Sequence, residues 1–186
     1  MSKKYLPLDL HEICNRRFVY DEVPGDDGDY GIEDLIVLKS SYPDSGEIYL
    51  NGVPFNYILG ANDHIECAAQ KIHIGGFIKK LHMVCFAYFG STYDYLTVKY
   101  MDGSVKKETV LMADWTILPG GISEFLISRT ENCAVQKGIK LILDGKSQLI
   151  CHAHHVIVSF QNPGGIEDIW LPDNQMLYVF AVTAEN

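Results

Sequence analysis

Three histidines within four residues form the densest group of chemically versatile side chains in the sequence. His152, His154 and His155 lie in the segment ICHAHHVIVSF, residues 150–160, which is otherwise mostly apolar. Side chains alternate between the two faces of a β-strand, so we expect His152 and His154 on one face and His155 on the other. Neutral imidazoles at this spacing can chelate a metal ion or transfer protons.

A metal site on this strand needs ligands from elsewhere in the chain. The usual partner of such a His-x-His pair is a glutamate a few residues later, but His155 is followed by Val-Ile-Val-Ser. His73 and His82 are available, although nothing in the sequence brings them to this strand. We therefore favour an ordinary strand on which His152 and His154 face solvent or a groove. A metal or catalytic cluster stays open as the alternative.

An acidic, glycine-rich stretch at residues 21–34 is the second candidate site. Asp26, Asp27 and Asp29 supply hard oxygen ligands of the kind that calcium prefers. The stretch lacks the glutamate that an EF-hand loop places at its twelfth position. We favour a solvated acidic loop, with a structural calcium site as the alternative.

Aromatic and acidic residues combine at residues 90–96, GSTYDYL, at the start of an expected strand. Tyr93 and Tyr95 can stack on the C–H face of a sugar ring, and Asp94 can accept hydrogen bonds from its hydroxyls. These three residues are therefore candidate ligand-binding residues. Aromatic side chains are also common in the cores of β-sandwiches, which is the structural alternative.

Catalytic motifs give no further support for an enzyme. The sequence contains no Gly-x-Ser-x-Gly elbow, phosphate-binding loop, dinucleotide fingerprint or HExxH motif. Two classes of function stay open: a non-catalytic binding protein, and a small glycoside-acting or metal-dependent enzyme that uses His152 and His154.

Length, charge and cysteine usage limit the class of protein. We expect residues 1–186 to form one domain. The net charge of −9 and the pI near 5.1 disfavour nucleic acid and anionic membranes as partners. The five cysteines are odd in number and form no CxxC pair, so we expect reduced, unlinked thiols. The segment MSKKYLPLDLHEICNRR lacks the apolar region of a secretion signal, and we expect a cytoplasmic protein.

Apolar runs broken by Gly, Pro, Asn and Asp indicate an all-β fold with almost no helix. One short helical turn is expected at residues 61–70. The strands are expected in a buried run at 79–90, a hairpin at 93–115 turning at Asp102-Gly103, a hairpin at 138–160 turning at Asp144-Gly145, and a strand pair at 164–186 joined at Pro172 to Asn174.

Several motifs in order along the chain carry a family resemblance. They are Asp9-Leu10 with Asn15, Gly52 to Phe55, Tyr100 to Gly103, Asp114-Trp115, Leu171 to Asp173, and Phe180 to Thr183. Together they resemble the galactose-binding-domain-like jelly-roll modules that accompany bacterial glycoside hydrolases. These motifs consist of turn and core residues, and they span nearly the whole chain.

The resemblance implies an antiparallel jelly-roll β-sandwich that binds carbohydrate without catalysis. It also implies that Trp115 and Trp170 belong to core motifs. Related sandwiches often hold a structural calcium near the chain termini, which adds Asp9 and Glu185 to the candidate metal ligands. The expected partners are a carbohydrate ligand and either a protein of a glycoside-processing system or a second copy of the chain.

Overall fold

The computed structural model describes residues 4–20, 37–39, 42–43, 46–117, 121–122, 132–143, 149–161 and 165–186. In these ranges the chain forms fourteen β-strands and no α-helix. The strand pairings are antiparallel, with the exception of β2 and β3. The expected all-β, antiparallel fold is confirmed. No helix in the described ranges is long and apolar enough to cross a membrane.

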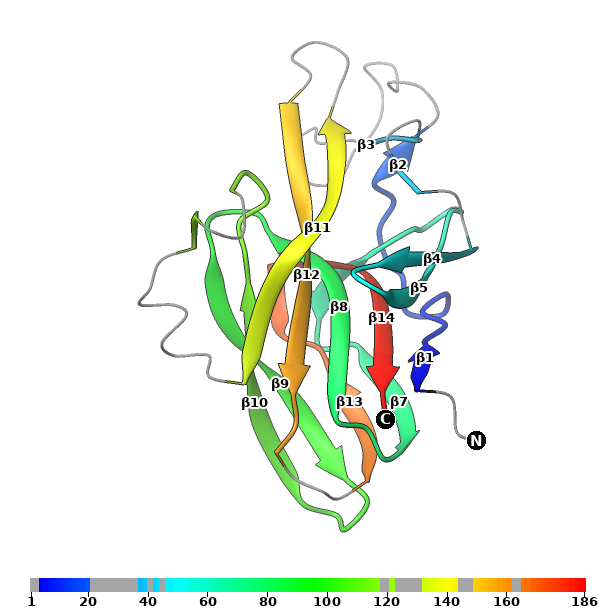
Figure 1. Cartoon of the computed structure of the whole chain (residues 1–186), viewed down its shortest axis with the longest axis vertical. Coiled ribbons are helices and arrows are strands. Elements are labelled where there is room, and N and C mark those ends of the chain that lie inside the picture. Colours follow the sequence, from blue (N-terminus) through cyan, green and yellow to red (C-terminus); the bar gives the residue numbers. More distant parts are fainter. Residues whose placement is uncertain are drawn as a thin grey trace.

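Two sheets and one separate hairpin make up the fold (Figure 1). The larger sheet has the order β1-β14-β8-β12-β11-β3-β2, and β6 also pairs with β14. Its strands are β1 (Tyr5–Pro7), β2 (Val19–Tyr20), β3 (Val37–Leu38), β6 (Ile65–Ala68), β8 (Lys80–Ala87), β11 (Cys133–Leu143), β12 (Leu149–Ser159) and β14 (Asp173–Glu185). The smaller sheet has the order β10-β9-β13-β7, with β7 (Lys71–Gly76), β9 (Thr92–Tyr100), β10 (Val105–Met112) and β13 (Ile166–Trp170). The hairpin consists of β4 (Gly46–Leu50) and β5 (Val53–Tyr57).

The main hydrophobic core lies between the two sheets. Alternate residues of β9, namely Leu96, Val98 and Tyr100, are fully buried and pack in one cluster with Met83 of β8 and Val156 of β12. The intervening β9 side chains therefore face away from the larger sheet, because successive residues of a strand point to opposite faces. The two sheets form a sandwich-like arrangement.

A second core covers the opposite face of the larger sheet. Phe55 of the β4–β5 hairpin packs there in one cluster with Phe86 of β8 and Phe180 of β14. The central strands of the larger sheet are thus buried on both faces, which explains why residues 79–90 are apolar without alternation. Figure 1 shows the β4–β5 hairpin lying across this sheet.

The expected hairpin at residues 93–115 is confirmed. β9 and β10 pair antiparallel, and Gly103 adopts a positive φ of 84° in the turn, a conformation that favours glycine. β11 and β12 also pair as expected, although their Asp144-Gly145 turn lies outside the described residues. Their register shifts between Gln136 and Ile139, where a Cβ on Gly138 would overlap the backbone of β12.

Two details differ from the sequence-based expectations. The helical turn expected at residues 61–70 is wrong, because Ile65 and Cys67 alternate with Glu66 along strand β6 and are fully buried against the core. The two strands expected at 164–186 are present, but they belong to different sheets. β13 lies in the smaller sheet and β14 in the larger one, so the Pro172 segment crosses between the layers.

The five cysteines are all free thiols. Four are buried, and Cys133 is half-buried. This agrees with the expectation of unlinked cysteines.

Candidate functional site

An open groove lies on the smaller sheet, at its face away from the larger sheet. Its volume is about 500 Å³. The described residues that line it come from β9, β10, β13 and the adjoining segments: Ala69, Asp94, Tyr95, Thr97, Val105, Lys107, Trp170, Leu171 and Asp173. Two aromatic rings, the exposed carboxylate of Asp173, the hydroxyl of Thr97 and the ammonium group of Lys107 therefore share one concave surface.

The sheet register explains why these side chains meet. Thr97 of β9 lies opposite Lys107 of β10 on one side and opposite Trp170 of β13 on the other. Residues opposite each other in a sheet project from the same face. Because Leu96 and Val98 point into the core, Thr97 and its two neighbours point outward.

Asp94 lies at one end of the groove, but alternation along β9 places its carboxylate on the side of Leu96 and the buried Val110, towards the larger sheet. Its Oδ1 accepts a hydrogen bond from the N–H of Tyr95 at 2.7 Å, and its Oδ2 accepts one from Nδ2 of Asn174 at 3.0 Å. The amide of Asn174 is itself oriented, since its Oδ1 accepts the N–H of Met176. Both carboxylate oxygens of Asp94 are thus engaged within the protein.

Tyr95 presents an accessible ring in the groove lining. Its exposed fraction is 42%, and Nζ of Lys107 lies 5.5 Å from the ring centroid. The ring of Tyr93 lies 6.3 Å away at 82°, next to the groove lining. Asp94 and Tyr95 thus both line the groove, with Tyr93 adjacent, although the side chains of Asp94 and Tyr95 leave β9 on opposite faces.

Sequence reasoning missed Thr97, Lys107 and Trp170 as lining residues. Trp170 was expected to be structural, but it is only half-buried and lines the groove. The alternation in β9 and β10 carried a usable signal, since it places Tyr95, Thr97 and Lys107 on the same outward face. Nothing in the sequence indicated that Thr97 lies opposite Trp170, because β9 and β13 are distant in sequence.

The histidine strand lies away from the groove. His152 and His154 share one face, with ring centroids 6.3 Å apart, and His155 contacts Phe55 on the opposite face, as expected. The expectation that His154 faces solvent or a groove is wrong. It is fully buried because the smaller sheet covers this face of β12. Its Nε2 donates to the carbonyl oxygen of Asp114 at 2.9 Å, and burial lowers its pKa.

His155 and His82 form a buried polar chain on the other face of the larger sheet. Asn51 Nδ2 lies 2.9 Å from His155 Nδ1, His155 Nε2 lies 3.0 Å from His82 Nδ1, and His82 Nε2 lies 2.9 Å from Glu185 Oε2. The amide nitrogen of Asn51 can only donate, and it also donates to the carbonyl of Lys137. Each histidine therefore accepts at Nδ1 and donates from Nε2, and every bond in the chain has the same direction.

This polar chain is closed to substrates. His155 and His82 are only 1% and 3% exposed. Burial, together with the nearby His82, lowers the pKa of His155 to about 4, and burial lowers the pKa of His82 despite its bond to Glu185. Both rings are neutral at pH 7. They join the turn of the β4–β5 hairpin to strands β12, β8 and β14.

The proposed calcium ligands are not brought together where the structure describes them. The loop residues Asp26, Asp27 and Asp29 lie outside the described residues. Asp9 accepts the N–H of His11, whereas Glu185 pairs with Lys4, Lys80 and His82. Strand β1 runs away from Glu185 towards Asp9, because Tyr5 lies opposite Glu185 and Pro7 opposite Thr183. The described residues contain no group of three His, Cys, Asp or Glu side chains that could hold a metal ion.

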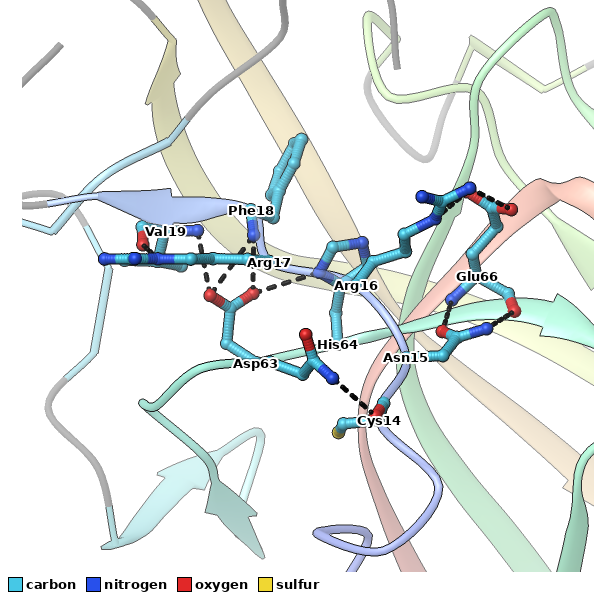
Figure 2. Close-up of polar contacts among 10 residues, drawn as sticks. Cys14, Asn15, Arg16, Arg17, Phe18, Val19, Asp63, His64 and Glu66 are labelled. Atoms are coloured by element: carbon cyan, nitrogen blue, oxygen red, sulfur yellow. Dashed lines mark hydrogen bonds and ion pairs between the residues drawn. The ribbon is translucent and has the colours of Figure 1, made fainter. Parts of the chain in front are cut away.

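A second buried polar cluster fixes the N-terminal segment to β6 (Figure 2). The carboxylate of Asp63 accepts the N–H groups of Phe18 and Val19 and contacts Nδ1 of His64 at 3.0 Å. Nearby, the guanidinium of Arg16 donates to both carboxylate oxygens of Glu66. These polar groups satisfy one another within the protein, so the cluster has a structural role.

Comparison with known proteins adds no functional assignment. No protein-family model and no curated protein matches the sequence. The groove differs from the two polar clusters because its aromatic, carboxylate and ammonium groups are accessible to a ligand.

Proposed function

We propose that the protein is a non-catalytic, lectin-like carbohydrate-binding protein of the galactose-binding-domain-like jelly-roll type. In this proposal the groove on the smaller sheet is the sugar site. The observation that carries the proposal is the combination of the accessible rings of Tyr95 and Trp170 with Thr97 and Lys107 in one open groove.

The chemistry of the groove suits a sugar ring. An aromatic face packs against the C–H groups of a pyranose, while carboxylate and hydroxyl oxygens exchange hydrogen bonds with its hydroxyl groups. Thr97 and Lys107 supply such polar groups from strands, which hold a site more precisely than mobile loops do. An open platform also suits a polysaccharide chain that extends beyond one ring.

An enzyme that uses the histidine strand has less support. His154 is fully buried and its Nε2 is occupied by the Asp114 carbonyl. His155 is equally buried and is bonded at both ring nitrogens. The imidazoles of His154 and His155 are engaged in packing and hydrogen bonds within the protein, where a substrate does not reach them. The binding function is therefore better supported than an enzyme.

A glycan array with the untagged full chain, probed with and without calcium, tests this function. We expect binding to a defined set of glycans. Trp170→Ala removes the stacking surface and is expected to weaken binding at least tenfold, which corresponds to a loss of about 1.4 kcal/mol. Tyr49→Ala is the matched control, because Tyr49 is 69% exposed on strand β4, outside the groove lining. Absence of any glycan binding, or wild-type affinity in Trp170→Ala, would refute the proposal.

A further inference from the structure

A row of outward side chains crosses all four strands of the smaller sheet. Lys107 on β10 lies opposite Thr97 on β9, Thr97 opposite Trp170 on β13, and Trp170 opposite Lys71 on β7. Strands in a sheet are about 4.8 Å apart, so the row extends over about 14 Å. The indole of Trp170 thus lies between two cationic side chains.

Lys107 differs from Lys71 and Lys99 of this sheet in its contacts. Lys71 pairs with Asp168 at 3.7 Å, and Lys99 pairs with Glu167 at 2.8 Å. Within the described part of the chain, the contact of Lys107 is with the ring of Tyr95. Its ammonium group therefore lines the groove without a carboxylate partner, although the chain has an excess of nine negative charges.

From this arrangement we infer that the groove selects acidic sugars, and that Lys107 binds the carboxylate or sulfate group which such a sugar carries. The inference rests on the proposed carbohydrate-binding function. Lysine recognises anions as a point charge with three donors, and hydrogen bonds between charged groups are stronger than neutral ones. A neutral sugar would make the stacking contact with Trp170 but would leave the ammonium group without an anion.

The opposite end of the groove fixes the orientation of the ligand. Asp94 precedes Thr97 by three residues on β9, which corresponds to about 10 Å along the strand. The exposed carboxylate of Asp173 lines the groove at that end, where it repels an anion and accepts hydrogen bonds from hydroxyls, whereas the Asp94 carboxylate projects towards the larger sheet. The acidic group of the sugar is thus directed to Lys107, and its hydroxyl groups to Asp173.

Isothermal titration of the full chain at pH 7 with three matched probes tests the inference. The probes are a galactose trisaccharide, the corresponding galacturonate trisaccharide and a sulfated galactose trisaccharide. We expect at least one acidic probe to bind about tenfold more tightly than the neutral one. Preference for only the carboxylated or only the sulfated probe identifies the acidic group that the groove selects.

Two variants on one strand separate a specific contact from general electrostatics. Lys107→Gln is expected to abolish the preference, so that the acidic and neutral probes bind this variant with similar affinity. Lys106→Gln makes the same change of charge, but Lys106 lies on the other face of β10, over the ring of Tyr100. It is expected to retain the wild-type preference. Both positions are exposed, so thermal midpoints should match the wild type.

The outcomes distinguish this inference from the proposed function. If no probe binds and no other glycan does, the carbohydrate-binding function itself is wrong. If neutral and acidic probes bind equally, the function stands and the selection of acidic sugars is wrong. Equal losses of preference in Lys107→Gln and Lys106→Gln would also overturn the role of Lys107, since only the overall charge would then matter.

Discussion

The chain from Asn51 through His155 and His82 to Glu185 predicts a loss of stability in mild acid. In the unfolded chain His155 takes up a proton near pH 6.5, whereas in the folded protein its pKa is about 4. Between these values the unfolded state binds more protons, so the free energy of unfolding falls as the pH is lowered. Above pH 6.5 this protonation does not reduce the free energy of unfolding. Below pH 4 the free energy of unfolding is lower by about 3 kcal/mol, at about 1.36 kcal/mol for each pKa unit between the two states.

The direction of the hydrogen bonds explains why a proton is poorly tolerated. A proton on His155 Nδ1 would face the amide nitrogen of Asn51, which also donates. A proton on His82 Nδ1 would face the N–H of His155. Glu185 attracts such a proton, but Lys4 and Lys80 beside it already compensate the charge of that carboxylate. The ring of Tyr5 packs edge-on against His82.

Urea unfolding of the wild type and of His155→Gln between pH 7 and pH 4.5 measures this effect. We expect the wild type to lose about 2 kcal/mol from pH 7 to pH 5 through His155 alone, and His155→Gln to lose correspondingly less. His11→Gln, at an exposed position of the N-terminal segment, is the control and should follow the wild-type curve. Parallel curves for the wild type and His155→Gln would contradict the reasoning, whatever the absolute stability of the variant.

Two further predictions concern the buried polar cluster and the thiols. Asp63→Ala leaves the N–H groups of Phe18 and Val19 without their acceptor and should cost about 3 kcal/mol of unfolding free energy, whereas Asp9→Ala, at an exposed carboxylate, should cost under about 1 kcal/mol. Equal costs in urea unfolding would show that the cluster does not hold the N-terminal segment. Thiol titration should find five groups after unfolding without reductant and slow reaction in the native state, because burial raises the thiol pKa values, for example to about 12 at Cys151. A count of one or three after unfolding would indicate disulfides.

The sequence predicted the parts of the fold that depend on local patterns. The Asp102-Gly103 turn and the alternation on both sides of it led to the β9–β10 hairpin, since turn chemistry and side-chain period act over a few residues. Residues 61–70 were wrongly expected to form a helical turn, because a short segment that mixes polar and apolar residues is compatible with a helical turn as well as with a strand. There, burial of Ile65 against β14 outweighs local preference.

The site was predicted only where its residues are close in sequence. Asp94 and Tyr95 were identified together because they are adjacent in the chain. Trp170 was expected in the core. Its exposure could not be predicted, because it depends on which strand lies beside β13 and on the fact that none of the described residues covers this face. The burial of His154 had the same origin, because alternation determines which residues share a face but not whether another sheet covers it.

The arrangement of layers also supports placing the proposed sugar site on the smaller sheet. In the described part of the chain, one face of the larger sheet packs on the smaller sheet and the other packs on the β4–β5 hairpin. On the smaller sheet, Ile117 and Ile122 cover the outer face only near Leu111, at the end of β10. None of the described residues covers the outer face around Thr97, and this face carries Tyr95 and Trp170, apolar rings that a purely structural surface would not need to expose. Accessible aromatic rings beside Lys107 therefore favour a ligand at this face, and Trp170→Ala is the variant that tests it most directly.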